Sequence, residues 1–402
     1  DSLAGSRLDE DGDTFPDLGQ TWSVPTVGRI QLKNASNVVE DRFVAIFGGG
    51  HDAERKTAPK SGSYVYIMDV ETGKVLYKQK LSGAIPSDPA VVDSNSDGLL
   101  DTIYIGTTAG FVYKIDMRTP VQLQPVTLTT GKGIPAFATN QTVQRITDAS
   151  WLPKAIFDTG GKPIYYPPIP LFIPKLETDA LVFGTGDRED LWNINGQEGR
   201  FYVVVDDGLT TAQNESSYVQ ITPTGTVSSA DLLINPPVGK KKGWYLRLPA
   251  NERVITKAFG LSGLLVFSTY EPQLITSTST TGPVCGRTGT SRAYTLYLNN
   301  GNPVLRDPDT GLDTRFQTSD VFTAPPTVDI GGTKNDTATG STVERLTPEQ
   351  VDIMSRLKAY FPQGCKFGNY WYTVSAMGSD TRFVAIAAIP ICFIEHNWKE
   401  VQ

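Results

Sequence analysis

Short runs of β-branched and aromatic residues recur along the chain, each bounded by Gly, Pro, Asn, Asp or Ser. Runs of this kind between turn-forming residues predict many short strands joined by tight turns. The pattern therefore predicts an all-β protein. Representative runs lie at residues 42–47, 64–68, 102–105, 111–115, 181–183, 201–205, 264–267 and 293–298.

Some of these runs repeat one another. Residues 65–69 read Val-Tyr-x-x-Asp, and residues 112–116 repeat that pattern 47 residues later, which is close to the length of one four-stranded propeller blade. Arg-Phe-Val-Ala-Ile occurs at 42–46 and again at 382–386. Repeats near both ends, with no low-complexity linker between them, favour one ring of blades. We expect a single modified β-propeller, with seven blades, over residues 1–402; two stacked β-sandwich domains are the alternative.

Two segments depart from the strand pattern. Residues 1–20 form an acidic amino-terminal segment, and residues 331–370 are expected to be an insertion that carries one helix. Thr347 to Gln350 supplies a helix start with Pro at the first helical position, and apolar residues then follow at helical spacing from Val351 to Phe361.

The charge balance argues against nucleic-acid binding, and the apolar runs argue against a membrane-spanning segment. The formal net charge is −7, from 36 basic and 43 acidic residues, and no long basic run offers the surface that a nucleic-acid backbone requires. The most apolar run, residues 384–394, has about half the roughly 20 residues of a membrane span and contains Pro390. We expect neither nucleic-acid binding nor a membrane-spanning segment.

The strongest chemical signal is the acidic loop of residues 93–101, Asp-Ser-Asn-Ser-Asp-Gly-Leu-Leu-Asp. Oxygen side chains stand at loop positions 1, 3, 5 and 9, with Gly98 at position 6, and Ca²⁺ takes six to eight oxygen ligands. An Asx-rich turn that binds no metal is the alternative, but three carboxylates so close together repel one another without a cation. The predicted Ca²⁺ ligands are Asp93, Asn95, Asp97, the Leu99 carbonyl and Asp101.

A second acidic segment repeats the same offsets with Asp9, Asp11, Asp13 and Asp17, but Thr14 replaces the glycine at position 6. It is a candidate second metal loop. Acidic residues are also common near chain ends, so both interpretations remain open.

The sequence offers no recognisable catalytic constellation. His51 and His396 are the only histidines, and neither lies in a nucleophile or metal motif. The acidic residues Asp187, Glu189 and Asp190 are interpreted as a solvated turn. Three cysteines without a Cys-x-x-Cys pair fit neither a zinc site nor a disulfide-rich scaffold. No catalytic residue is predicted, and the protein is not expected to be an enzyme.

Taken in order, the motifs resemble the carboxy-terminal propeller domain of the PilY1/PilC family, which are tip-associated proteins of bacterial type IV pili. The resemblance covers nearly the whole chain, and it depends on the order of the motifs because each motif alone is weak. The motifs are residues 18–25, 46–50, 68–73, the loop 93–101, residues 104–116, 183–186, 243–248 with 252–254, 266–269, Cys285 before 289–294, and 398–401.

The resemblance implies a calcium-binding, non-enzymatic module of pilus biogenesis, whose metal state influences pilus extension against retraction. It implies major or minor pilins as partners and an extracellular location at the pilus tip, after transit through the periplasm. Such a location makes a disulfide plausible, with Cys285 and Cys365 as the expected pair. The resemblance also implies a role in twitching motility. The family's amino-terminal adhesive region is missing from these residues, so adhesion to a host or abiotic surface is implied only for a longer protein.

A second hypothesis is kept beside this one. A propeller enzyme of the quinoprotein-dehydrogenase type, or a carbohydrate-binding propeller, would use calcium only as a structural ion. A pocket with perturbed titratable groups would favour that hypothesis.

Overall fold

The computed structural model describes residues 9–10, 13, 15–55, 58–128, 142–225, 229–261, 263–273, 288–307, 310–319, 327–332, 351, 355, 366–377 and 383–393. These residues form two compact units, which are described separately. The first unit comprises Asp1–Glu189, Gly199–Gln220 and Pro236–Tyr245, and the second comprises Asp190–Glu198, Ile221–Asn235 and Leu246–Gln402. No helix in the described part of the chain has the length and apolar character of a membrane span.

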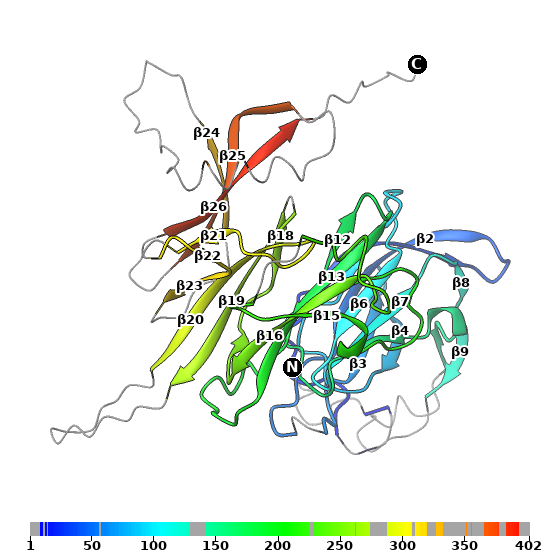
Figure 1. The fold of residues 1–402 in the computed structure, drawn as a ribbon. Coiled ribbons are helices and arrows are strands. Elements are labelled where there is room, and N and C mark those ends of the chain that lie inside the picture. Colours follow the sequence, from blue (N-terminus) through cyan, green and yellow to red (C-terminus); the bar gives the residue numbers. More distant parts are fainter. Residues whose placement is uncertain are drawn as a thin grey trace, which may run out of the picture. The chain divides into compact units, whose positions relative to one another are not determined.

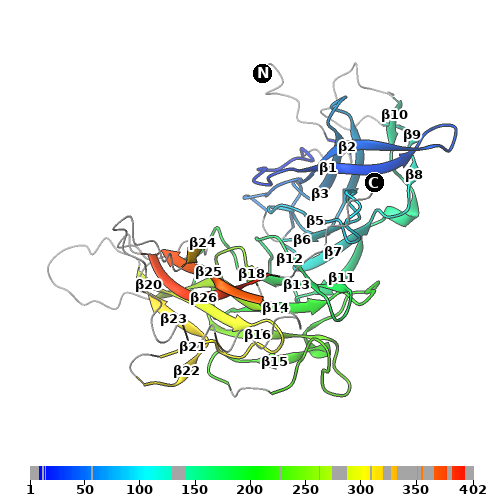
Figure 2. The ribbon, with the colours of Figure 1, turned by 90° about the horizontal axis from the view of Figure 1, so that it is seen from above.

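The first sheet comes first in the sequence of the first unit and has the strand order β4-β3-β2-β1-β8. Figure 1 labels four of its strands, β2, β3, β4 and β8. Its neighbouring strands β1 to β4 are antiparallel, as a propeller blade requires, while β8 is parallel to β1. Figure 2 shows β1, β2 and β3 side by side. The bounds are β1 Thr26–Lys33, β2 Val39–Gly48, β3 Tyr64–Asp69, β4 Val75–Lys80 and β8 Val121–Gln122.

The second sheet has the order β11-β7-β6-β5, and all its neighbouring strands are antiparallel. Its bounds are β5 Ala90–Val92, β6 Thr102–Gly106, β7 Phe111–Asp116 and β11 Lys154–Asp158. The short 3-10 helix η2, Ala149–Trp151, precedes β11, and the hairpin of β9 Gln124–Thr127 and β10 Thr142–Arg145 lies between β8 and η2 in the sequence.

The third sheet has the order β12-β13-β14-β16-β15. Its strands β12, β13 and most of β14 belong to the first unit. Its bounds are β12 Ile169–Ile173, β13 Thr178–Gly184, β14 Glu198–Val205, β15 Val219–Ile221 and β16 Gly243–Ala250, with the 3-10 helix η3 at Glu215–Ser217.

Strand β6 shows how neighbouring sheets pack. All five of its residues are buried. Ile103 and Ile105 belong to the core that also contains Ile46 and Ile67 of the first sheet. Tyr104 points to the opposite face and belongs to the core with Phe183 of the third sheet. Since side chains alternate along a strand, the second sheet is covered on both faces, as a propeller blade is.

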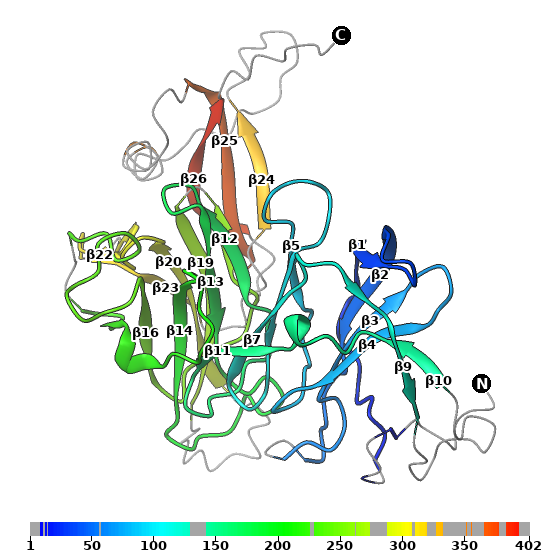
Figure 3. The ribbon, with the colours of Figure 1, turned by 90° about the vertical axis from the view of Figure 1, so that its right-hand side faces the viewer.

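The second unit contains the sheet β17-β19-β20-β23, with β18 paired to β19, a two-stranded sheet β21-β22, and the three-stranded sheet β24-β25-β26. Figure 3 shows β24, β25 and β26 side by side. Its strands are β17 Arg253–Val254, β18 Phe259–Leu261, β19 Leu264–Gln273, β20 Thr288–Tyr297, β21 Leu305–Arg306, β22 Asp313–Thr314, β23 Phe316–Ser319, β24 Thr327–Gly332, β25 Lys366–Met377 and β26 Phe383–Phe393.

The all-β prediction is confirmed, and the sequence repeat has a structural counterpart. Residues 65–69 lie in β3, which pairs with the preceding strand β2. Residues 112–116 lie in β7, which pairs in the same way with the preceding strand β6. Asp69 and Asp116 end these strands by accepting the amides of Thr72 and Arg118. The count of seven blades and the boundaries 1–402 stay predictions. Most of the predicted insertion at 331–370 lies outside the described residues. Of those that the structure describes, Val351 and Ser355 are helical.

Candidate functional site

The predicted calcium loop connects the antiparallel strands β5 and β6. At its base the Asp101 amide donates to the Val92 carbonyl at 2.8 Å, which closes the hairpin. The Leu100 amide donates to the carbonyl of Arg29 on β1, also at 2.8 Å. The loop is therefore attached to the first and second sheets together.

Inside the loop, side-chain oxygens turn toward the backbone. The Asp93 carboxylate accepts the amides of Asp97 at 3.2 Å and Gly98 at 2.8 Å. The Asn95 side-chain oxygen accepts the same Asp97 amide at 3.0 Å, so the oxygens of Asp93 and Asn95 converge. The Asp97 carboxylate accepts the amide of Leu99 at 2.8 Å. The chain thus curls around its own acidic side chains.

Two left-handed residues produce this curl. Ser96 has φ of 60° and Gly98 has φ of 83°. Glycine adopts such a conformation without the steric cost of a Cβ atom, which is the role expected at position 6 of the loop.

Asp101 occupies a different environment from the other predicted ligands. Its side chain is buried at the start of β6, and its Oδ2 accepts both the amide of Ser94 at 2.9 Å and the Ser94 hydroxyl at 2.5 Å. Asp93 is half-buried, and Asn95 and Asp97 are exposed. Asp101 therefore ties the end of the loop back to its beginning.

The donor set fits a hard cation, because every predicted ligand atom is an oxygen. Within the described residues, however, no three Asp, Glu, His or Cys side chains are gathered closely enough to hold a metal ion. A bound Ca²⁺ would have to draw Asp97 and Asp101 toward Asp93. The assignment of Asp93, Asn95, Asp97, Leu99 and Asp101 as ligands stays a prediction.

The second acidic segment is balanced by basic side chains. Asp17 is buried, and its Oδ2 lies 2.6 Å from Lys78 Nζ. Glu10 lies 2.9 Å from the same Lys78 nitrogen and 3.2 Å from Arg145. The Lys78 ammonium also lies over the Tyr64 ring, 4.6 Å from its centroid. Lysine therefore supplies a cation to this segment.

The other members of that candidate loop are placed separately. Asp9 is buried, and Asp13 accepts the amide of Phe15 at 3.0 Å and lies 3.7 Å from Lys60. Asp11 lies outside the described residues. The metal assignment of the 9–17 segment also stays a prediction.

The remaining residues singled out from the sequence are the histidines, the acidic turn at 187–190 and the cysteines. His51 is buried, stacks on Trp22 with ring centroids 5.3 Å apart, and places Nε2 2.8 Å from Glu189. Glu189 therefore does not belong to a merely solvated turn. Cys285, Cys365 and His396 lie outside the described residues, and with them the predicted disulfide.

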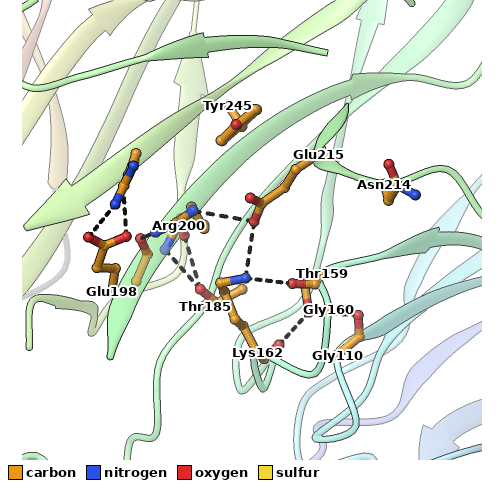
Figure 4. Close-up of polar contacts among 12 residues, drawn as sticks. Gly110, Thr159, Gly160, Lys162, Thr185, Glu198, Arg200, Asn214, Glu215 and Tyr245 are labelled. Atoms are coloured by element: carbon orange, nitrogen blue, oxygen red, sulfur yellow. Dashed lines mark hydrogen bonds and ion pairs between the residues drawn. The ribbon is translucent and has the colours of Figure 1, made fainter. Parts of the chain in front are cut away.

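Sequence reasoning missed a polar cluster around Glu215 at the start of η3 (Figure 4). The Glu215 carboxylate accepts the Tyr202 hydroxyl at 2.7 Å and lies 3.2 Å from Lys162 and 3.3 Å from Arg200. Lys162 also donates to the Thr159 carbonyl. These contacts join η3 to β14 and to the turn after β11, and no local sequence signal marks them because the partners are far apart in the chain.

The family model named PilY1 beta-propeller domain matches residues 9–220. Among curated proteins, the type IV pilus biogenesis factor PilY1 of Pseudomonas aeruginosa strain PAO1 is 29% identical over 110 residues, which are 26% of this chain and 8% of that protein. The PilY1 homolog of Xylella fastidiosa strain Temecula1 is 24% identical over 321 residues, 72% of this chain and 19% of that protein.

The chain thus spans a fifth or less of the length of these curated relatives. Among solved structures, the crystal structure of the Pseudomonas aeruginosa PilY1 C-terminal domain aligns with a TM-score of 0.48 and 17% identity, covering 77% of this chain and 68% of that one. The family match extends over more than half of the chain and includes the loop 93–101. The chain belongs to the PilY1 β-propeller domain family.

Proposed function

We propose that this propeller is a calcium-binding, non-enzymatic module of type IV pilus biogenesis, whose calcium state modulates pilus extension against retraction. Two curated relatives carry the name type IV pilus biogenesis factor PilY1 or its homolog. The observation that carries the calcium part is the curled loop, in which Asp93 and Asn95 oxygens converge on the Asp97 amide.

Calcium would act on this loop through charge. Asp93, Asp97 and Asp101 lie within nine residues, and a divalent cation removes their mutual repulsion. Bringing Asp97 toward Asp93 would order the exposed middle of the loop. Because the Leu100 amide is hydrogen-bonded to the Arg29 carbonyl, the ordered loop would also fix the middle of β1.

A pilus role requires that this change reaches a partner. We propose that the partner is a pilin, met at the extracellular pilus tip after transit through the periplasm. Calcium then acts as a switch only where the pilin binds the calcium-loaded and calcium-free propeller with different affinity. Surface adhesion belongs to this proposal only for a longer protein that carries a further adhesive region.

The test combines calcium titration calorimetry with pilus counting. We would compare the wild-type chain with Asp97→Asn, which removes a carboxylate from an exposed loop position. Glu71→Gln is the matched control, because it removes an exposed carboxylate from the turn between β3 and β4. The same substitutions would be placed in the protein as the cell makes it, and surface pili would be counted.

We expect Asp97→Asn to lose calcium binding and to change the number of pili, whereas Glu71→Gln changes neither. A wild-type chain that releases no heat with calcium would contradict the metal site. Loss of calcium binding with normal pilus numbers and normal retraction would contradict the switch.

A further inference from the structure

Four polar side chains of the first unit meet away from the calcium loop. Tyr104 of β6 and Lys114 of β7 are direct cross-strand partners. Both reach Asp206, the residue that follows β14: the Tyr104 hydroxyl and Lys114 Nζ each lie 2.6 Å from Asp206 Oδ2. The other carboxylate oxygen, Oδ1, accepts the amide of Leu209 at 3.2 Å. A buried carboxylate is thus held on both oxygens beside a lysine.

Asp179 of β13 is the fourth member of this cluster. The register Ala180 to Val205 places Asp179 next to Asp206, and the Asp206 amide donates to the Asp179 carbonyl at 2.8 Å. Burial, and then the charge of Asp206, raises the pKa of Asp179, while Lys114 opposes that shift. Asp179 is thus a second carboxyl group beside the contact between Lys114 and Asp206.

The contact between Lys114 and Asp206 is almost dry. The Asp206 side chain is 2% exposed and the Lys114 side chain 17% exposed. The lysine must lose a proton before it can attack, and Asp206 Oδ2, 2.6 Å from Lys114 Nζ, lies in position to accept that proton. A neutral lysine amine is a competent nucleophile toward a carbonyl carbon. Because the two groups are already in contact, the reaction is intramolecular. Well-oriented reactions of this kind reach effective concentrations of about 10⁵–10⁸ M, which raises their rate.

We propose that Lys114 and Asp206 form an intramolecular isopeptide bond. Lys114 Nζ passes one proton to Oδ2, and the resulting amine attacks Cγ of Asp206. Negative charge develops on Oδ1, where the Leu209 amide stabilises it, as donors of an oxyanion hole do. A second proton from the nitrogen reaches Oδ2 through the Tyr104 hydroxyl, the Cγ–Oδ2 bond breaks, and Oδ2 leaves as water. The third proton remains on the amide nitrogen.

The bond would join two sheets of the propeller covalently. Lys114 belongs to the second sheet, and Asp206 follows a strand of the third, and these sheets share the core that contains Tyr104 and Phe183. The chain between Lys114 and Asp206 would become a closed loop, which restricts the unfolded chain in the way a disulfide does.

Intact-mass spectrometry of the denatured chain tests the proposal. We expect the wild-type chain to be about 18 Da lighter than its sequence mass, since one water is lost. Lys114→Arg preserves the charge but cannot form the same amide, so its mass should equal the sequence mass. Lys154→Arg is the matched control: Lys154 lies opposite Lys114 on β11 but is exposed, and its substitution should leave the deficit in place.

Peptide mapping and a second variant make the result decisive. Proteolysis should release one branched peptide that contains both Lys114 and Asp206. Tyr104→Phe removes the proton relay, and folded Tyr104→Phe protein should carry a smaller crosslinked fraction soon after purification. A wild-type mass equal to the sequence mass would overturn the proposal. A deficit that maps to another pair, such as Lys78 with Asp17, would overturn it too.

Discussion

Two acidic segments of the first unit share the same spacing of oxygen side chains, but different groups contact their carboxylates. In residues 9–17 the carboxylates of Glu10 and Asp17 contact the ammonium of Lys78, which is buried with them. In residues 93–101 the described partners of Asp93, Asp97 and Asp101 are amides and one hydroxyl. Amides and hydroxyls bond a carboxylate but do not cancel its charge. Spacing alone therefore predicts an acidic cluster, and the neighbouring strands decide which cation serves it.

The largest expected effect follows from removing the lysine of the first segment. Lys78→Met leaves the buried Asp17 without the ammonium that contacts it, while Glu10 keeps its contact with Arg145. Breaking a buried pair in this way costs about 3–5 kcal/mol. Chemical denaturation of the purified chain measures the change. Lys74→Met, at an exposed position in the turn before β4, is the control and should stay within about 0.5 kcal/mol of wild type. A loss below about 1 kcal/mol for Lys78→Met would show that Lys78 is not the cation of this segment.

A smaller effect is expected from supplying calcium to the second segment. A ligand that binds only the folded state stabilises it by about 2.7 kcal/mol at a concentration one hundred times Kd. We expect this stabilisation in the wild-type chain and in Asp13→Asn, but not in Asp97→Asn, as measured by thermal unfolding with and without calcium. Equal stabilisation of all three proteins would break the distinction between the two segments.

The turn residue of the calcium loop gives a third comparison. Gly98 has φ of 83°, and a side chain in that left-handed conformation costs about 1–2 kcal/mol. Gly73, with φ of 67° in the turn between β3 and β4, is the matched position. Both Gly98→Ala and Gly73→Ala should lower stability by similar amounts, whereas calorimetry should show weakened calcium binding only for Gly98→Ala. Weakening by Gly73→Ala as well would mean that general destabilisation explains the effect.

The smallest expected effect comes from a basic residue beside the calcium loop. A Cβ atom on Gly98 would lie 3.1 Å from Arg29 Nη2, so a guanidinium faces the loop, and Arg29 is also paired with Asp41 at 3.1 Å. Removing this positive charge with Arg29→Gln should raise calcium affinity by about threefold at low salt, which is within the range of exposed charge pairs.

Added salt should reduce that gain, because it screens exposed charges. Arg42→Gln, on the neighbouring strand β2, is the control, and calorimetry at two salt concentrations is the measurement. An unchanged or lower affinity in Arg29→Gln would show that the guanidinium does not oppose the ion.

Local sequence patterns predicted the strands well. The run 111–115 falls within β7, and the run 42–47 within β2, because period-two burial of aromatic and β-branched residues is a local property. Gly98 was also predictable, since its residue type reflects its own φ. The stretch 163–174 was harder to predict. Its prolines indicate a surface connection, yet Ile164 and Tyr165 are buried and residues 169–173 form β12.

Contacts between distant residues could not be predicted in the same way. Lys78 meets Asp17 across 61 residues, and Lys114 meets Asp206 across 92 residues. Each lysine stands in an ordinary strand sequence, and only the packing of sheets brings the carboxylate to it. The same applies to His51 and Glu189, because the sequence does not show that a residue of the acidic turn contacts a buried histidine.

Strand β6 also limits how the loop before it can vary in evolution. Ile103 and Ile105 pack in one core and Tyr104 in the other. If one residue between Val92 and Thr102 were deleted and the loop kept its length, the pairing of β6 with β5 would slip by one residue and the two faces of β6 would be exchanged. The isoleucines would then meet the aromatic core, and the Tyr104 hydroxyl would be turned away from Asp206. Substitutions in the loop act within the loop itself, whereas a change of a single codon in its length would disturb both neighbouring cores.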